Sequence, residues 1–234
     1  VEVPKEYQSW LKAEALSETE LKVTTTTTNN LMVNRVGHII MKTKEVIDGF
    51  DGITFDISQG TAFWKEGGAD NYVVDEETGY MTLYGSGIVT NYLFKKGRLA
   101  FDFESINLTG EDWIEFNMWP NSGNTNFHLH FYANKESNFT CGGSGLNWTQ
   151  KTFTWTSEQT NVVKKIEFLV VNKEEGSNAL VLKLIIDGVE VAVLDNNITD
   201  PYATEPGAPV YFRMHTTNKA SNFTVKSITW EPVE

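Results

Sequence analysis

From about residue 31 onward, the sequence repeats one pattern, in which short runs of alternating apolar and polar residues are separated by Gly, Asn, Asp and Pro. Alternation with a period of two places every apolar side chain of an extended strand on one face, so each run predicts a half-buried β-strand. About eleven runs fit this description, at residues 81–84, 88–94, 98–108, 113–119, 127–134, 151–156, 164–172, 180–186, 189–194, 210–215 and 223–230. The pattern predicts an all-β fold of two stacked antiparallel sheets, a jelly roll or related β-sandwich.

One turn can be predicted from two residues alone. Asp187-Gly188 separates the runs LKLII and VEVAVL. A two-residue hairpin turn of type I′ needs a positive φ at both central positions, which Asp and Gly tolerate better than most residues. We therefore expect these two strands to form an antiparallel hairpin.

The first thirty residues follow a different pattern. Over residues 4–22, the apolar side chains fall roughly on one helical face, behind a proline suited to a first helical position: Pro4, Tyr7, Trp10, Leu11 and Leu16. This predicts a short amphipathic helix. The Thr-rich run 24–30 is interpreted as a linker or loop, with an extended segment as the alternative because Thr favours strands. The predicted domains are a helical segment with a linker over 1–30 and the β-sandwich over 31–234.

Charge and cysteine content exclude several kinds of partner and site. The formal net charge is −12, whereas binding to nucleic acid or to an anionic membrane needs a cationic surface. Cys141 is the single cysteine, so neither an intrachain disulfide nor a cysteine metal cluster can form. No apolar run reaches the roughly 18 residues of a membrane span, and the N-terminus lacks a secretion-signal pattern. We expect a soluble, extracellular or cell-surface protein without membrane insertion, whose signal has been removed.

Residues 111–134 predict two neighbouring strands with very different faces. With strands over 113–119 and 126–132, one face is apolar throughout and must be the core side: Ile114, Phe116, Met118, Phe127, Leu129 and Phe131. The other face combines aromatic, acidic, amide and imidazole side chains: Trp113, Glu115, Asn117, Trp119, His128, His130 and Tyr132. A symmetric connecting loop predicts three directly opposed pairs with Cβ atoms about 5 Å apart: Trp113 with Tyr132, Glu115 with His130, and Asn117 with His128.

This second face predicts a carbohydrate-binding surface. Exposed apolar patches usually mark an interaction site, and sugar rings stack on aromatic rings while polar side chains bind their hydroxyl groups. Arg213 and His215 alternate with apolar residues and extend the face if their strand joins the same sheet. The row of Tyr80, Thr82 and Tyr84 is a second extension. Two alternatives stay open: an ordinary solvated face, and a face covered by a loop or by the N-terminal helix through Trp10.

Two segments resemble the concanavalin A-like lectin and glucanase superfamily. They are SGIVTNYLFKKGRLAFDFESINL at residues 86–108, and LVLKLIIDGVEVAVLDN followed by PVYFRMHTTNKASNFTVKSITW. The resemblance implies a curved two-sheet sandwich whose concave face meets carbohydrate. In the laminarinase-type hydrolases of this superfamily, the nucleophile and general acid lie on one strand as Glu-x-Asp-x-Glu or its bulged form. Here the strand reads Glu111-Asp112-Trp113-Ile114-Glu115. Glu111 and Glu115 share a face, but Trp113 takes the middle place, and Asp112 faces the other way unless a bulge shifts it.

Other chemistries use some of the same residues. Glu115 and His130 could act as base and acid of a glycoside hydrolase or a polysaccharide lyase, with Tyr132 as a second proton donor. The two histidines with Glu115 could hold a metal ion if His215 completed the set. Calcium could bind one of two loop clusters for stability: Asp48, Asp51 and Asp56, or Asp195, Asn196 and Asp200. No other cofactor is expected.

The sequence leads to one main functional prediction and two alternatives. The prediction is noncatalytic binding of a neutral polysaccharide by a monomeric module of a secreted bacterial protein that degrades glycans or adheres to them. Trp113 and Trp119 are about 20 Å apart along a strand, too far to stack adjacent sugars, which favours starch-like α-glucans over flat β-glucans. The alternatives are the Glu115/His130 enzyme and a protein-adhesion or structural sandwich.

Overall fold

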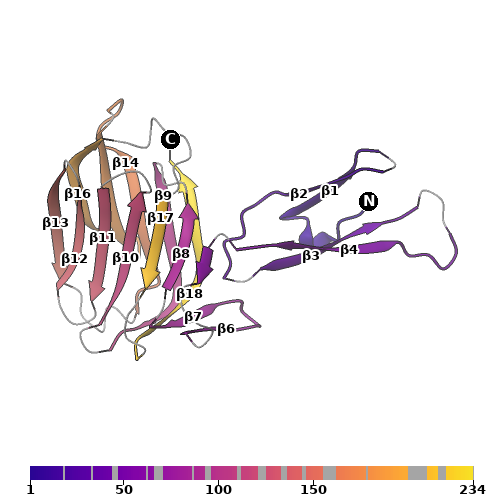
Figure 1. Ribbon diagram of the computed structural model, residues 1–234, viewed down its shortest axis with the longest axis horizontal. Helices are drawn as coiled ribbons and strands as arrows, with labels where there is room; N and C mark the ends of the chain where they lie inside the picture. The colour runs from indigo at the N-terminus through magenta and orange to yellow at the C-terminus, as the bar shows by residue number, and fades with distance from the viewer. Residues whose placement is uncertain are drawn as a thin grey trace. The chain divides into compact units, whose positions relative to one another are not determined.

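The period-two runs fold as strands in the computed structural model of the chain (Figure 1). The structure describes residues 1–234 except 18, 33, 44–46, 62, 66–70, 86, 93–95, 110–111, 121–124, 133–135, 144–145, 155–161, 178, 200–209, 216–219 and 234. Within described strands, the side chains of 63–65, 89–92, 117–120, 125–128, 140–143, 146–150, 154, 179–180, 195–199 and 210–215 also lie outside the description.

All eleven predicted runs correspond to strands. They are β7 (Met81–Tyr84), β8 (Gly87–Tyr92), β9 (Gly97–Asn107), β10 (Trp113–Pro120), β11 (Thr125–Tyr132), β13 (Leu146–Thr154), β14 (Lys165–Asn172), β15 (Ala179–Ile186), β16 (Val189–Thr199), β17 (Val210–His215) and β18 (Asn222–Pro232). Three further strands of the same part of the chain do not follow from the pattern, β5 (Phe63–Lys65), β6 (Tyr72–Val74) and β12 (Glu136–Gly143). The all-β prediction is confirmed.

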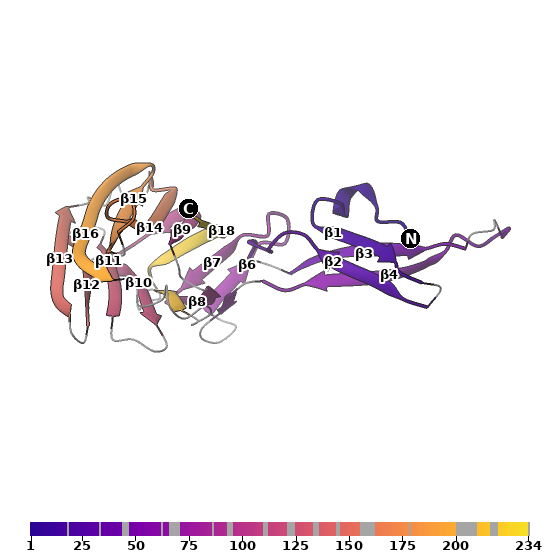
Figure 2. The ribbon, with the colours of Figure 1, turned by 90° about the horizontal axis from the view of Figure 1, so that it is seen from above.

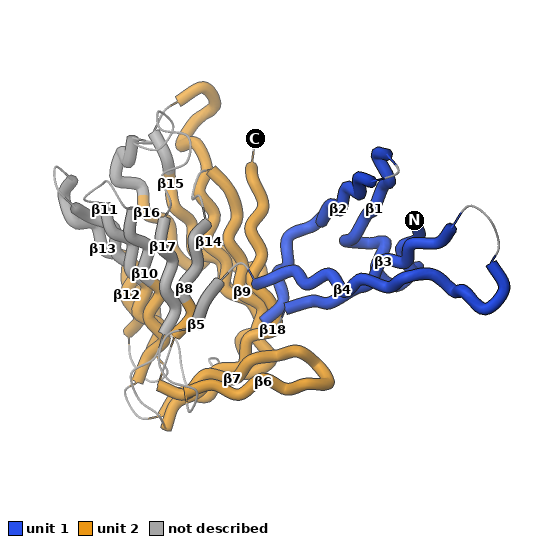
Figure 3. Tube along the Cα trace, turned by 45° about the vertical axis from the view of Figure 1, so that its right-hand side comes forward, with its two compact units in different colours: residues 1–62 blue, residues 63–234 orange. Residues whose placement is uncertain are grey.

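The chain divides into two compact units, residues 1–62 and 63–234, coloured separately in Figure 3. The boundary lies between Ala62 and Phe63 rather than at the predicted position after residue 30. Residues 31–62 therefore belong with the N-terminal segment and not with the sandwich. The reason is that two strands of this stretch, β3 (Arg35–Met41) and β4 (Ile53–Gln59), pair with each other and pack against the preceding segment.

The second unit is a sandwich of two seven-stranded sheets. The front sheet has the strand order β13-β12-β11-β10-β17-β8-β5, and the back sheet has the order β16-β15-β14-β9-β18-β7-β6. Figure 2 shows the two sheets as two layers. Every pairing within them is antiparallel among the described strands.

Phenylalanines from both sheets fill the space between the layers. The Phe101 and Phe168 rings of the back sheet lie 5.3 Å and 5.4 Å from the Phe116 ring of the front sheet, measured between centroids. Phe139, also from the front sheet, lies 6.1 Å from Phe168. All four are at most 1% exposed. These edge-on and tilted contacts are the arrangement that the charge distribution of aromatic rings favours, and they fix which face of each sheet is the inner one.

The predicted hairpin turn is confirmed. Asp187 and Gly188 have φ angles of 47° and 81°, and they connect β15 to its antiparallel partner β16. The Asp187 carboxylate also accepts hydrogen bonds from the backbone N–H groups of Lys164 and Lys165, at 2.9 Å and 2.7 Å. The turn therefore holds the start of β14 as well as joining two strands.

The predicted helix over residues 4–22 is wrong. Only a 3-10 turn, η1 (Lys5–Tyr7), forms in the described part of this stretch, followed by a hairpin of β1 (Leu11–Ala15) and β2 (Leu21–Thr25). Trp10 and Leu11 pack with Ile39 of β3 in the core of the first unit. A Cβ at Gly37 would lie only 2.9 Å from the Trp10 ring. Tyr7, Trp10 and Leu11, which suggested a helical face, therefore lie in a turn and a strand that pack against the β3–β4 hairpin, whereas Leu16 is exposed. Two of the threonines interpreted as a linker are the last residues of β2.

A series of polar contacts also connects the N-terminal turn of the first unit to its β3–β4 hairpin. The Tyr7 hydroxyl lies 3.0 Å from His38 Nε2, and His38 Nδ1 lies 2.9 Å from a carboxylate oxygen of Asp56. His38 and Asp56 are directly opposed on β3 and β4. Together with the ring contact between Tyr7 and His38, these bonds tie the N-terminal turn to the hairpin.

Candidate functional site

The two faces of the β10–β11 pair differ as the sequence predicts. Ile114, Phe116, Leu129 and Phe131 are at most 1% exposed and belong to the core. The intervening residues are half-buried and lie on the outer face of the front sheet: Trp113, Glu115, His130 and Tyr132. The alternation prediction is confirmed for the described side chains of this pair.

The predicted register is confirmed too. Trp113 is opposite Tyr132, Glu115 is opposite His130, and Asn117 is opposite His128. The two strands pair continuously from Trp113 to Met118, so no bulge interrupts this stretch. Asp112, which could join the outer face only through a bulge, is buried.

Strand β17 extends the same face on the other side of β10. Glu115 is opposite His215, and Asn117 is opposite Arg213. Directly opposed residues of an antiparallel pair lie on the same face of a sheet. The structure thus brings Arg213 and His215 into the predicted set, which makes Glu115 the middle member of a row that runs His130, Glu115, His215.

The described side chains of the set are in contact with one another. The Trp113 ring centroid lies 5.4 Å from that of Tyr132 and 6.0 Å from that of His130, at interplanar angles of 46° and 53°. His130 Nε2 lies 3.8 Å from a carboxylate oxygen of Glu115. The His130 side chain is 33% exposed and that of Glu115 is 18% exposed. The two groups are accessible from solvent and partly sheltered by their neighbours.

The described contacts of the Trp113 side chain are made by its ring. Its indole Nε1 is buried and has no hydrogen-bond partner among the described residues. Burying an N–H group without a hydrogen-bond partner costs free energy. We therefore attribute the conformation of Trp113 to the packing of its ring and not to a hydrogen bond of its Nε1. The ring contacts with His130 and Tyr132 are then the part of Trp113 that shapes this face.

Further residues join the outer face through strands and positions outside the predicted set. Asn138 and Thr140 of β12 are opposite His130 and His128. Trp64 of β5 is opposite Val89, which is itself opposite Arg213. Tyr211 is opposite Trp119. The outer face of the front sheet therefore carries aromatic residues at several register positions around a polar centre.

Some of the predicted residues are placed only by their backbone. Trp119, Asn117, His128, Arg213 and His215 occupy the register positions given above, and their side chains lie outside the described ones. Glu111 lies outside the described residues altogether. Their place in the sheet follows from the strand pairing alone.

Two other parts of the sequence prediction are wrong. Tyr80, Thr82 and Tyr84 do not extend this face, because β7 belongs to the back sheet. The helix expected to carry Trp10 does not form, and Trp10 packs in the core of the first unit, where it is 6% exposed.

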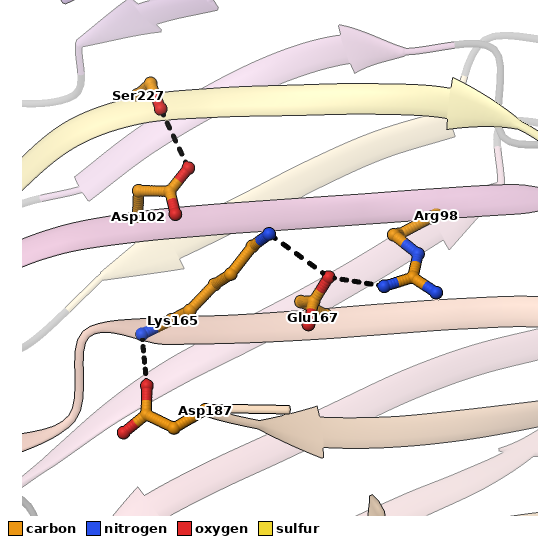
Figure 4. A network of polar contacts seen from close by, with 6 residues as sticks. All are labelled: Arg98, Asp102, Lys165, Glu167, Asp187 and Ser227. Carbon is orange, nitrogen blue, oxygen red and sulfur yellow. Dashed lines mark hydrogen bonds and ion pairs between the residues drawn. The ribbon is translucent and has the colours of Figure 1, made fainter. Parts of the chain in front are cut away.

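The outer face of the back sheet has a different character, because its polar side chains bind one another. Thr224 Oγ1 lies 2.8 Å from the Thr82 hydroxyl and accepts a hydrogen bond from Ser105 Oγ at 3.2 Å. Figure 4 shows the charged part of this face, where the Glu167 carboxylate lies 2.8 Å from Arg98 Nη1 and 3.4 Å from Lys165 Nζ. Ser227 donates to Asp102 in the same view. These groups satisfy each other and form a charged and hydroxyl-bearing surface without an aromatic cluster among the described contacts.

The predicted calcium clusters are only partly described. Asp48 and Asp51 lie between β3 and β4, and Asp56 lies in β4, where it bonds His38. Asp195 and Asn196 fall in β16 rather than in a loop, and Asp200 lies outside the described residues. Among the described side chains, no group of three His, Cys, Asp or Glu lies together as a metal site would require. No helix in the described part of the chain has the length and apolar character of a membrane span.

Comparison with known proteins finds similarity in structure only. No family model matches the sequence, and no curated protein matches it. A solved structure of SCLam, a non-specific endo-beta-1,3(4)-glucanase of family GH16 crystallised with a glucan oligosaccharide, superposes with a TM-score of 0.51 at 10% identity. The match covers 72% of this chain and 87% of that one.

Two further structures match with slightly lower scores. A Bacillus licheniformis β-glucanase matches at a TM-score of 0.48 and 11% identity, over 74% of this chain and 92% of that one. A legume lectin-like domain from Entamoeba histolytica matches at a TM-score of 0.48 and 11% identity, over 74% and 91%. Identities this low leave activity open. Together with the two antiparallel sheets described above, the SCLam superposition identifies the fold of the second unit as a concanavalin A-like jelly-roll β-sandwich.

Proposed function

We propose that the outer face of the front sheet binds a neutral polysaccharide without cleaving it. The observation that carries the proposal is the contact cluster of Trp113, His130 and Tyr132 beside the Glu115 carboxylate. The C–H faces of sugars pack against aromatic rings, while carboxylate, amide and imidazole groups bind hydroxyl groups. The chain would act as a single-copy module of a secreted bacterial protein that degrades glycans or adheres to them.

The charge of the chain supports a neutral ligand. A net charge of −12 repels polyanions such as uronans at long range. The face itself offers hydrogen-bonding groups of both kinds, with Glu115 as an acceptor and Asn138 in the next strand but one as a donor and acceptor. A neutral glycan needs this combination and no cationic surface.

The tilt of the aromatic rings supports a curved chain over a flat one. Trp113 and Tyr132 make an angle of 46° and Trp113 and His130 an angle of 53°, so the rings form a cradle and not a coplanar row. A flat β-glucan ribbon prefers coplanar rings, whereas the curved turn of an α-glucan can rest in a cradle. We therefore propose starch-like α-glucans as the preferred class.

The carboxylates of β10 favour binding over hydrolysis. Retaining hydrolysis uses two carboxyl groups about 5 Å apart on one face. On the described part of this strand Glu115 is the one carboxylate of the outer face, Trp113 takes the middle place, and the preceding Asp112 is buried. Among the described residues of this stretch, no second carboxylate lies beside Glu115, as cleavage would require, and Glu111 lies outside them.

Affinity electrophoresis against starch, glycogen, mixed-linkage β-glucan and laminarin tests the proposal. We expect starch and glycogen to retard the wild-type chain in the gel. The Trp113→Ala and Tyr132→Ala variants should lose this retardation. Tyr84→Ala is the matched control, because Tyr84 is a half-buried tyrosine on β7 of the back sheet. No retardation of the wild-type chain on any glycan would refute the proposal and favour a protein-adhesion surface. Equal loss in the Tyr84 variant would point to a general structural defect.

One observation favours a second candidate, an enzyme that uses Glu115 and His130. Their polar atoms are 3.8 Å apart on an accessible face, close to the geometry of a general acid and base that tightens when substrate binds. Incubation with the same glycans and with uronans, followed by measurement of new reducing ends and of unsaturated products, tests it. Products that disappear in Glu115→Gln while retardation persists would establish catalysis.

A further inference from the structure

Strand β4 of the first unit has a single neighbouring strand among the described residues. It pairs with β3 over its whole length, from Ile53 to Gln59, and these two strands form a separate sheet. The far edge of β3 is bonded at one position by Glu2, whose backbone exchanges hydrogen bonds of 2.9 Å and 2.8 Å with that of Ile40. Along the far edge of β4, the described part of the chain places no strand.

The contact between Glu2 and Ile40 shows which backbone groups of β4 point outward. Ile40 directs its N–H and C=O groups toward Glu2 and therefore away from β4. In an antiparallel pair, two directly opposed residues either exchange both hydrogen bonds or exchange none. Thr54, which is opposite Ile40, therefore directs its own N–H and C=O groups away from β3. The alternation extends this to Asp56 and Ser58, so the edge offers a row of donors and acceptors to another strand.

One face of this edge is apolar and only partly covered. Ile53, Phe55 and Ile57 alternate along β4 and so lie on one face. Ile57 packs against the core of the first unit, whereas Ile53 and Phe55 are 54% and 44% exposed. Met41, opposite Ile53 on β3, is 37% exposed. Exposed apolar side chains beside an open strand edge are typical of a surface that another chain covers.

The sequence of β4 matches itself when two copies run antiparallel. Pairing centred on Phe55 places this ring opposite its own copy and Ile53 opposite the second copy's Ile57. On the other face, the hydroxyl of Thr54 comes opposite the carboxylate of Asp56, which can accept a hydrogen bond from it. Pairing centred on Asp56 would instead place two carboxylates opposite each other, which is destabilising. The charge pattern therefore selects the register centred on Phe55.

We infer that the chain pairs with a second copy of itself through the outer edge of β4, with Phe55 at the two-fold axis. The pairing joins the two-stranded sheets of both copies into one of four strands, and a two-stranded sheet alone is marginally stable. A contact between identical edges closes at two copies. The inference departs from the monomeric module expected from the sequence. It does not depend on glycan binding, and each parent protein would still carry one copy of the module.

Sedimentation of the full chain over a range of concentrations tests the pairing, and we expect a dimer that dissociates on dilution. Thr54→Pro removes an outward N–H group at a position where an edge strand tolerates proline. It should weaken dimerisation by about tenfold, because the symmetric dimer loses two hydrogen bonds. Thr54→Ser keeps this N–H group and should behave like the wild type.

A charge at the centre of the contact gives a second test of association. Phe55→Lys places two cations opposite each other and should also weaken dimerisation. Val36→Lys is the matched control, because Val36 is a 53% exposed apolar residue of β3 in the same hairpin. It should leave dimerisation unchanged.

Cysteine cross-linking tests the register in a Cys141→Ser background, in which the chain has no other thiol. Directly opposed residues of an antiparallel pair have Cα atoms about 4.5–5.5 Å apart, within reach of a disulfide. Phe55→Cys should therefore form a cross-linked dimer under mild oxidation, and Asp56→Cys should not. Mixing Thr54→Cys chains with Asp56→Cys chains should give a cross-linked heterodimer.

Circular dichroism checks that each variant folds, and Phe55→Lys decides the matter if Thr54→Pro does not fold. A chain that sediments as a monomer at every concentration would overturn the inference. Dimerisation at wild-type strength in Phe55→Lys would overturn it as well. Cross-linking of Asp56→Cys without cross-linking of Phe55→Cys would show that the register is wrong. Assemblies that keep growing with concentration would contradict a contact that closes at two copies.

Discussion

At the scale of single residues, Glu167 shows how the back sheet tolerates a charge with almost no access to water. Its side chain is 4% exposed, and its carboxylate lies between Arg98 and Lys165, whose side chains are 39% and 40% exposed. A buried carboxylate without partners is very unfavourable. The two cations therefore stabilise the buried carboxylate of Glu167. Because both cations are partly exposed to water, each ion pair contributes less to the free energy of unfolding than a fully buried pair would.

Replacing Glu167 tests the importance of these two ion pairs. Glu167→Ala leaves two partly exposed cations without their carboxylate, and we expect the free energy of unfolding to fall by about 1–2 kcal/mol, less than for a fully buried pair. Urea denaturation of the full chain measures the change. Lys183→Ala is the control, because its ion pair with Glu190 has side chains 31% and 46% exposed and should contribute under about 1 kcal/mol. Equal effects of the two substitutions would contradict a special role for Glu167.

At the scale of elements, a strand is harder to predict from the sequence where one of its inward positions is polar. Strand β12 escapes the pattern because its inward positions include Ser137, which is completely buried. The Ser137 hydroxyl accepts a hydrogen bond from the backbone N–H of Tyr132 on the neighbouring strand, at 3.0 Å. A buried polar residue whose hydrogen bond is satisfied looks, in sequence, like a break in the alternation. The helix predicted over 4–22 does not form for the opposite reason, because tertiary packing of Trp10 and Leu11 overrides a local pattern.

The β15–β16 turn yields a prediction about backbone conformation. Gly188 has a φ of 81°, and no atom lies within 4 Å of the position that a Cβ would take, so an added methyl group meets strain rather than a clash. Gly188→Ala should destabilise the chain by about 1 kcal/mol. Val189→Ala is the neighbouring control, since Val189 is 62% exposed and should change stability little. Chemical denaturation compares the two, and an unchanged midpoint for Gly188→Ala would contradict the role of the left-handed conformation.

The β6–β7 turn yields a prediction about pH. Hydrogen bonds from the Thr78 backbone N–H, the Thr78 hydroxyl and the Glu77 backbone N–H lower the pKa of Asp75 below its usual value. A lowered folded-state pKa means that the carboxylate stabilises the turn above the unfolded-state pKa of about 3.9, and that this contribution is lost as pH falls through the folded-state pKa. Carboxyl NMR titration of the full chain should place the pKa of Asp75 below that unfolded-state value. In Thr78→Val the Asp75 pKa should move back up, and a pKa that stays low would contradict the hydroxyl contribution.

At the scale of the whole molecule, the two units have separate cores of very different size. The first is built around Trp10, Leu11 and Ile39, whereas the second contains layers of phenylalanines between two seven-stranded sheets. Periodicity predicts the strands of the sandwich and even the β10–β11 register, since both depend on local pattern and one loop. It does not predict the unit boundary or the place of β17 between β10 and β8, because pairing between distant strands depends on tertiary packing.

Calorimetry of the full chain tests the separation of the cores. We expect two unfolding transitions. Ile39→Ala should lower the stability of the first unit by about 2–4 kcal/mol and leave the second transition in place, and Ile114→Ala should do the reverse. Both side chains are at most 1% exposed, so the pair is matched in chemistry and burial. A single transition that both substitutions shift equally would show that the chain unfolds as one cooperative unit.

The position of β17 also determines at which stage of folding the candidate site can form. Glu115 meets His130 through a short hairpin, but its pairing with His215 joins strands that are far apart in the chain. Closing a loop of about a hundred residues costs entropy before its contacts form. We therefore expect the row around Glu115 to be completed late in folding, and on the ribosome only after β17 has been synthesised. Glycan binding at this face would then serve as a kinetic marker for the last step of folding.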